Sequence, residues 1–533
     1  MTPASRALLL LALSAFALRL AALGLQGPAT MDWDAANYAR IAQNMHDGVG
    51  NVTLRGVPNV LHAPFYPLLM AALLFFMRSP AAAGIAVSLV SGTLLVVLVY
   101  RLAAAIADDR AALVAAGLAA LHPFLIGASI VPLSEALFIA LAFAGLDALV
   151  RALKRPSLRG LALAGLWFGC AYLTREEGLA YVAIGAVAVS LAALRARTPA
   201  RTIATRLTVL LVPFFLCAAP YVAFLAHATG QIGFEAKSAS NYGISIRMIR
   251  GLAYVAAADA IGPNLEDVGV ELGKSYPFSA ARVPSPSPRD RMRLALQAAP
   301  RHVVDLLHVL AAKHNGSLLF PAFAIVGLMV QLRARPSGYD LILVACLLAE
   351  FAALLTVFHF WDRYAYPFAA LLLPWTACGI VAAARYARRW LHRVARARLA
   401  AAACTIAIAI GSAWFTITVI ELRRNAVDPV VFRDAGTWIA AHARRNSVVM
   451  AVDPLTAYYC GGTWRALPFA DGPTALRYIA SRKPDFVVIS TVFSERPYLG
   501  SWMAGGIPDA AAHRVFQERR GNAQIVAYRW GKG

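Results

Sequence analysis

Long apolar runs separated by short polar stretches make up most of this 533-residue chain. Runs of roughly 17 to 25 apolar residues have the length of an α-helix that crosses a bilayer. They lie near residues 7–26, 82–106, 110–127, 131–150, 160–174, 178–194, 207–226, 316–332, 340–358, 364–384 and 399–420. The pattern predicts an all-α polytopic membrane protein with about eleven transmembrane helices.

One further apolar run, 61–77, has two interpretations. It is long enough to span, but Pro64 and Pro67 lie near its start. Short basic linkers at 151–159 and 195–206 are typical of the cytoplasmic side. If these linkers are cytoplasmic and the polar loop after the first span is external, an even number of spans must lie between that loop and Ile130. Only two of the three candidate runs can then be spans. We therefore predict that 61–77 is an interfacial helix and that the loops 27–80 and 227–315 are external.

Beyond residue 420 the apolar runs give way to short alternating elements. They predict a membrane domain over 1–420 and a small α/β domain over 421–533. Helices are expected at 431–443 and 475–481, and buried strands at 448–452, 486–489 and 525–530. The same topology places the N-terminus in the cytoplasm and the α/β domain outside.

The composition agrees with a membrane protein, with 59% hydrophobic and 15% charged residues and a mean hydropathy of +0.61. The formal net charge of +22 comes from linkers between helices, so it indicates topology and contact with anionic lipid headgroups, not nucleic-acid binding. Five of the six cysteines lie in apolar runs and Cys460 stands apart, so neither a disulfide nor a structural zinc site is predicted. We interpret the long apolar N-terminus as a retained anchor.

The polar loop after the first span carries two acids, Asp32 and Asp34, in the segment MDWDAANYARIAQNMHDG. A bilayer interface would hold them at the mouth of a membrane cavity. Two readings of Asp34 stay open. It could cap the amphipathic helix that follows, in which Tyr38 and Ile41 recur at helical spacing, or it could act chemically.

Charges inside or beside spans are candidates for function, because a charge in hydrocarbon is costly. Glu135 lies one turn into a predicted span, and LTREEG places Arg175, Glu176 and Glu177 between two spans. Each has a structural alternative, since Glu135 could close a capping box and the others could form a polar hairpin turn. We predict that Arg175 pairs with a carboxylate of a neighbouring span.

The segment HFWDRYAYPF places His359, Arg363 and Tyr364 at the external end of a late span, and Lys237 follows a glycine-rich bend on the same predicted face. The planar guanidinium of Arg363 suits phosphate, although an aromatic belt with an interfacial arginine would look similar. An acidic loop that faces several cations is what transfer from a lipid-linked phosphate needs. The acid would activate a hydroxyl acceptor as general base, and the cations would stabilise the departing phosphate.

Several motifs in order resemble the bacterial relatives of protein O-mannosyltransferases and lipid A aminoarabinose transferases, which are GT-C class glycosyltransferases. These are DWDAANYARIAQNMHDG, HAPFYPLL, PLSEALF, LTREEG, TGQIGFEAKSASN and DRYAYPFAALLLP. The resemblance implies a polyprenyl-phosphate sugar donor, inverting transfer of a hexose or pentose, and a hydroxyl acceptor on a protein, lipid or glycan. It also implies the periplasmic face of a bacterial inner membrane.

By position in these motifs, Asp34 matches the family's catalytic acid and Arg363-Tyr364 its late Arg-Tyr pair, which with Lys237 would bind the donor phosphate. Many relatives carry a second acid directly after the first, whereas this chain has Ala35 there. Asp32 and Glu135 are therefore the candidates for a second acid. The supporting residues expected around them are Tyr38, His62, Arg175, Glu176 and His359.

No cofactor or metal ligand set is predicted, and a need for a divalent metal stays open. Two other functions also stay open. A multi-span transporter would show paired half-sequences with broken spans, which the sequence lacks. A non-catalytic envelope assembly protein would use the C-terminal domain to bind a partner, and a transfer assay separates it from an enzyme.

Overall fold

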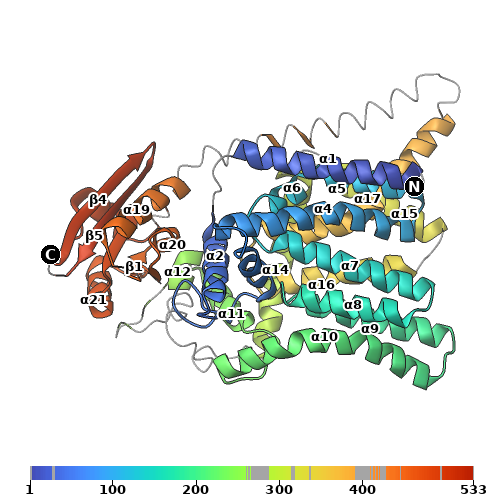
Figure 1. The fold of residues 1–533 in the computed structure, drawn as a ribbon, viewed down its shortest axis with the longest axis horizontal. Helices are drawn as coiled ribbons and strands as arrows, with labels where there is room; N and C mark the ends of the chain where they lie inside the picture. Colours follow the sequence, from blue (N-terminus) through green and yellow to red (C-terminus); the bar gives the residue numbers. More distant parts are fainter. Residues whose placement is uncertain are drawn as a thin grey trace.

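A computed structural model describes residues 3–26, 31–259, 287–313, 319–334, 338–390, 428–444, 446–492 and 495–531, with a few single positions between these ranges. The helices form a bundle, and a small sheet domain lies at one end of it (Figure 1). The predicted span 399–420 falls largely outside the described residues.

The bundle is built from long apolar helices. These are α1 (Pro3–Gln26), α4 (Pro80–Ile106), α5 (Asp109–Leu121), α6 (Pro123–Ser129), α7 (Glu135–Lys154), α8 (Leu158–Tyr172), α9 (Gly178–Arg195), α10 (Ala200–Thr229), α15 (Leu319–Ala334), α16 (Gly338–Leu354) and α17 (Tyr366–Trp390). Ten of the eleven predicted spans are thus helical within the described residues, with α5 and α6 sharing one. By length and apolar character, six described helices can cross a membrane, or seven if the bent pair α5–α6 is one span.

A second group of helices lies at the end of the bundle that faces the sheet domain (Figure 1). They are α2 (Trp33–His46), α3 (Phe65–Leu73), α11 (Lys237–Ile249), α12 (Tyr254–Asp259) and α14 (Pro288–His308), followed by a π-helical turn at Val309–Lys313. The predicted interfacial helix 61–77 is helical only over the nine residues of α3. A nine-residue helix is too short to span a bilayer, which agrees with the parity argument.

The helix breaks between α5 and α6 at the extended His122 and at Pro123, and a buried arginine binds the carbonyls at the break. The two helices meet at 55°, and the side chain of Arg19 in α1 is fully buried beside the break. It donates hydrogen bonds to the carbonyl oxygens of Ala119 and Ala120 and to Ser129 Oγ. The cation therefore binds carbonyls that the broken helix leaves without helical partners.

Glycines bring pairs of helices into direct backbone contact. A Cβ on Gly327 would lie 1.8 Å from the carbonyl oxygen of Trp375, and one on Gly379 would lie 2.0 Å from that of Phe323. These contacts join α15 to α17. Small residues at such crossings are typical of membrane helix pairs. This pair positions α17, which directly follows the 3₁₀ turn Asp362–Ala365 that carries Arg363.

The C-terminal domain is α/β, as predicted. Its elements are α19 (Asp428–His442), β1 (Val448–Ala451), α20 (Leu455–Tyr459), β2 (Thr463–Ala466), α21 (Gly472–Arg482), β3 (Phe486–Ser490), α22 (Leu499–Gly505), β4 (Ala512–Arg520) and β5 (Ala523–Trp530). The sheet order is β2-β1-β3-β5-β4, parallel among the first three strands and antiparallel beyond. The sequence predicts β1, β3 and β5 but misses β2 and β4, a four-residue strand and a charged edge strand.

Candidate active site

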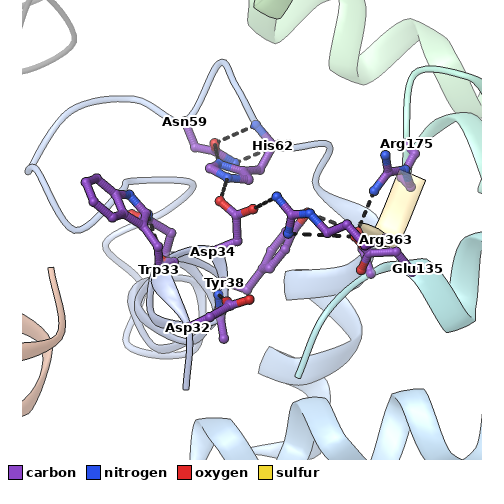
Figure 2. Close-up of polar contacts among 12 residues, drawn as sticks. Asp32, Trp33, Asp34, Tyr38, Asn59, His62, Glu135, Arg175 and Arg363 are labelled. Carbon is purple, nitrogen blue, oxygen red and sulfur yellow. Dashed lines mark hydrogen bonds and ion pairs between the residues drawn. The ribbon is translucent and has the colours of Figure 1, made fainter. Parts of the chain in front are cut away.

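The two acids of the first polar loop have different roles in helix α2. Asp32 is the N-cap, and its Oδ1 accepts a hydrogen bond of 2.8 Å from the backbone N–H of Ala35. The prediction that Asp34 could be the cap is therefore wrong by two residues. Asp34 lies in the first turn, and its carboxylate is left for contacts outside α2 (Figure 2).

Asp34 contacts the guanidinium of Arg363 and the imidazole of His62. Its Oδ2 accepts a hydrogen bond from Arg363 Nη2, and its Oδ1 lies 3.6 Å from His62 Nε2. Asn59 orients the histidine, because its Oδ1 accepts from the His62 backbone N–H at 3.0 Å and lies 3.3 Å from the ring Nδ1. The carboxylate is thus held between two groups that favour its charged form.

The pKa shifts of Asp34 and Tyr38 follow from this geometry. Burial by itself would raise the pKa of Asp34, but the Arg363 guanidinium and the His62 ring outweigh it and hold that pKa well below its usual value. Burial raises the pKa of Tyr38, whose hydroxyl pairs with Ser134 Oγ at 3.0 Å, so the phenol stays neutral. The site therefore holds an ionised acid next to neutral hydrogen-bonding groups.

A second carboxylate, Glu135, shares the arginine. Arg363 Nη1 lies 3.8 Å from Glu135 Oε1, and Arg175 Nη1 lies 3.1 Å from the same oxygen. Arg175 also binds Glu177 at 2.9 Å. The predicted pairing of Arg175 with a carboxylate of a neighbouring span is confirmed. Glu135 itself is the first residue of α7, not one turn inside it, because residues 131–134 are not helical.

One cavity is lined by Asp34, His62, Glu135, Arg175 and Arg363, together with Lys237, His359 and Tyr364. Lys237 is the first residue of α11, where the sequence suggests only a bend. The hydroxyl of Tyr364 lies 3.3 Å from His359 Nε2. The structure thus brings Asp34, Glu135, Arg175, Arg363 and the three residues above to one cavity.

Glu176 stands apart from the cavity lining. It lies in the turn between α8 and α9, and the ion pairs described for Arg175 involve its neighbour Glu177 instead. Burial raises the pKa of Glu176, and the charge of Lys237 opposes that rise. Conversely, burial lowers the pKa of Lys237, but the nearby Glu176, Tyr364 and Glu177 together outweigh burial, and the pKa is raised.

Sequence reasoning missed several residues of the site. Trp33 and Arg55 line the cavity, and Asn59 and Ser134 hold His62 and Tyr38. Asn59 precedes His62 by three residues, a spacing that suits a local side-chain to backbone turn and could have been noticed. The others depend on contacts across the fold. Among the described residues, no group of three or more His, Cys, Asp and Glu side chains is arranged to hold a metal ion.

The arrangement suits one kind of chemistry. The ionised Asp34 carboxylate pairs with Arg363 in a cavity that Arg175, Lys237 and aromatic side chains also line. Cations positioned in this way can bind a phosphate, and the carboxylate can take a proton from a group next to that phosphate.

Comparisons with known proteins were made for both the sequence and the fold. The family model for dolichyl-phosphate-mannose-protein mannosyltransferases matches residues 61–224. A search of curated protein sequences found no match.

Solved structures cover nearly the whole chain. ArnT from Cupriavidus metallidurans bound to undecaprenyl phosphate has a TM-score of 0.63 at 14% identity, covering 97% of each chain. The Archaeoglobus fulgidus oligosaccharyltransferase complex with zinc and sulfate has a TM-score of 0.61 at 16% identity, covering 98% of this chain and 73% of that one. The archaeal oligosaccharyltransferase AglB from the same organism, with an inhibitory peptide and a dolichol-phosphate, has a TM-score of 0.55 at 15% identity, with coverages of 98% and 74%.

These findings confirm the resemblance that the sequence motifs indicate. The chain has the fold of the GT-C glycosyltransferases and, over residues 61–224, is similar to the dolichyl-phosphate-mannose-protein mannosyltransferase family.

Proposed function

We propose that this protein is an integral membrane glycosyltransferase that moves one hexose or pentose from a polyprenyl-phosphate donor to a hydroxyl acceptor on a protein, lipid or glycan. The observation that carries the proposal is the pairing of Asp34 with Arg363 in a cavity that Lys237 also lines. The structures of similar fold with undecaprenyl phosphate and with a dolichol-phosphate support the donor class.

In the proposed reaction, the Asp34 carboxylate takes the proton of the acceptor hydroxyl. The acceptor oxygen then forms a bond to the anomeric carbon from the face opposite the phosphate. The bond between that carbon and the phosphate oxygen breaks, and its electron pair stays on the polyprenyl phosphate. Arg363 and Lys237 stabilise this charge, and the sugar configuration inverts.

Arg363 links binding of the donor to activation of the base. In the structure its guanidinium contacts Asp34 and lies 3.8 Å from Glu135 Oε1. A donor phosphate would compete for the same N–H groups. As the guanidinium turns to the phosphate, Asp34 loses part of the charge that holds its pKa low, and it becomes a stronger base.

No comparable observation supports a transporter or a non-catalytic assembly protein. Among the described helices the bent pair α5–α6 is one broken span, but it lies away from the paired charges of the cavity. A non-catalytic assembly protein would have no use for an ionised carboxylate that faces cations in a cavity. Measured transfer from a lipid-linked donor decides between these classes.

We propose that the cavity faces the periplasm of a bacterial inner membrane, with the N-terminus in the cytoplasm. Cysteines placed one at a time should then react with an impermeant maleimide at Asn51, Arg289 and Ser501 in intact cells. Cysteines at Pro156 and Pro199 should react only after the membrane is opened, because the basic linkers beside them stay inside. Labelling at Pro156 in intact cells would overturn this topology.

Asp34→Asn should abolish transfer while folding and donor binding stay nearly unchanged, because the amide keeps the shape of the side chain but cannot take the proton. The assay uses purified protein in lipid nanodiscs with a panel of undecaprenyl-phosphate hexoses and pentoses. The matched control is Asp32→Asn, which keeps the α2 cap because asparagine caps as well as aspartate. It should keep most of the activity, and the opposite ranking would move the base to Asp32.

Arg363→Lys should lower kcat/KM by well over tenfold, which corresponds to more than about 1.4 kcal/mol of transition-state stabilisation. The guanidinium reaches Asp34 and Glu135 with different nitrogens, and a single ammonium cannot do both while it binds a phosphate. Steady-state kinetics with the donor that supports turnover measure the loss. Full activity in the lysine variant would show that only a positive charge is needed.

The pH profile should report the Arg363–Asp34 pair. The active form of the base is ionised, so the rate falls as the pH drops through the pKa of Asp34. In the wild type that pKa is held well below its usual value, and kcat/KM should stay flat down to about pH 5. In Arg363→Gln the pKa rises, and the fall in the residual rate should move to higher pH. Arg159→Gln, which changes an exposed arginine in the first turn of α8, should leave the profile unchanged.

A further inference from the structure

The C-terminal domain contacts the candidate active site through one tryptophan. Trp464 in β2 is fully buried, and its indole N–H donates to the carbonyl oxygen of Ala451 at 3.1 Å. Its backbone N–H donates to the carbonyl oxygen of Leu54, in the external loop of the membrane domain, at 3.0 Å. A backbone hydrogen bond therefore joins β2 of the sheet domain to the loop that carries His62.

The ring of Trp464 contacts two residues that line the cavity. It meets Trp33 edge to face with 4.8 Å between ring centroids, and the Arg55 guanidinium lies over it at 4.2 Å. Both contacts are favourable in their geometry. Trp464 itself is not part of the cavity lining, whereas Trp33 and Arg55 are. Trp33 lies between the cap Asp32 and the proposed base Asp34, so the ring of Trp464 packs against the first turn of α2.

A second contact joins the same domain to another wall of the cavity. Arg496 pairs with Asp259 at 2.5 Å, and both side chains are at most 4% exposed. The backbone N–H of Phe469 also donates to the carbonyl oxygen of Asp259 at 2.8 Å. Asp259 ends helix α12, whose first residue, Tyr254, lines the cavity and packs against His359 at 5.1 Å.

Helix α2 needs such support. It has 14 residues, and isolated helices of that length are marginal in water. The membrane domain holds the first turn of α2 through the contacts of Asp34, and the sheet domain contacts α2 through Arg40. This side chain donates to the carbonyl oxygens of Tyr458 at 3.2 Å and Gly461 at 3.3 Å. The described contacts of α2 thus come from both domains.

From these contacts we infer that Trp464 is a positioning residue of the active site, and that the C-terminal domain sets the place of Asp34 through the Trp464–Trp33 contact. The inference rests on the proposed function for its effect on catalysis. The alternative is that Trp464 only packs in the hydrophobic core of its own domain. That alternative predicts a loss of stability with no selective effect on turnover.

Trp464→Ala should lower kcat by about tenfold to a hundredfold with little change in the KM for undecaprenyl-phosphate mannose, because a small misplacement of a catalytic group has that effect. Trp464→Phe keeps an aromatic ring against Trp33 and should recover most of the rate. The matched control is Trp438→Ala in α19, which removes a tryptophan that stacks on His442 within the same domain. It should leave kcat unchanged.

Hydrogen exchange gives a readout that needs no catalysis. In full-length protein in nanodiscs, Trp464→Ala should speed exchange in residues 33–37 and 51–60, and Trp438→Ala should not. Trp33→Leu removes the same ring contact from the membrane side and leaves the sheet domain intact. It should reproduce the loss of kcat, and it keeps the test valid if Trp464→Ala does not fold.

Unchanged kcat in a folded Trp464→Ala protein overturns the inference, whether or not exchange becomes faster. So does an equal loss of kcat in Trp438→Ala, which would indicate a general effect of domain stability. If the wild type transfers none of the tested sugars, the proposed function fails. In that case unchanged exchange in residues 33–37 still overturns positioning by Trp464, and faster exchange there supports it.

Discussion

The guanidinium of Arg363 is the group on which the candidate site depends, because it joins carboxylates from two elements that are far apart in the sequence. Asp34 comes from the short helix α2 and Glu135 from the start of the long helix α7. Arg175 balances Glu135 from a third element. Charges at the end of a membrane bundle persist only when they are paired, and loss of one partner typically costs about 3–5 kcal/mol. In the proposed function a donor phosphate would take over part of this network, and this would couple donor binding to activation of the base.

Much of this arrangement follows from local patterns in the sequence. Apolar run length predicts α4 and α9 to within a few residues, and buried four- and five-residue strands are visible as β1 and β3. Charged residues beside spans also point to the site, because hydrocarbon excludes unpaired charge. Asp34, Glu135, Arg175 and Arg363 are all found in this way, and the structure places them within one network.

What the sequence does not predict depends on contacts between distant segments. The caps show the limit, since Asp32 and Asp34 are both good cap residues and only the backbone at Asp32 decides between them. Strand β4 is charged because it is an edge strand with one side in solvent, and its pattern therefore lacks a buried run. Trp33 and Trp464 are ordinary apolar residues in the sequence, and their contact appears only when β2 meets the loop that carries His62.

The two sides of α2 are held by different kinds of interaction, and this difference matters for catalysis. On the membrane side Asp34 pairs with Arg363 and lies beside His62, and in the proposed function a donor phosphate would compete for Arg363. On the other side the contacts are the aromatic pair of Trp33 with Trp464 and hydrogen bonds from Arg40 to two backbone carbonyl oxygens, and no carboxylate takes part in them. If a phosphate draws Arg363 away, as in the proposed reaction, these contacts would keep the first turn of α2 in place. The carboxylate would then gain basicity without losing its position, which is what a general base next to a departing phosphate requires.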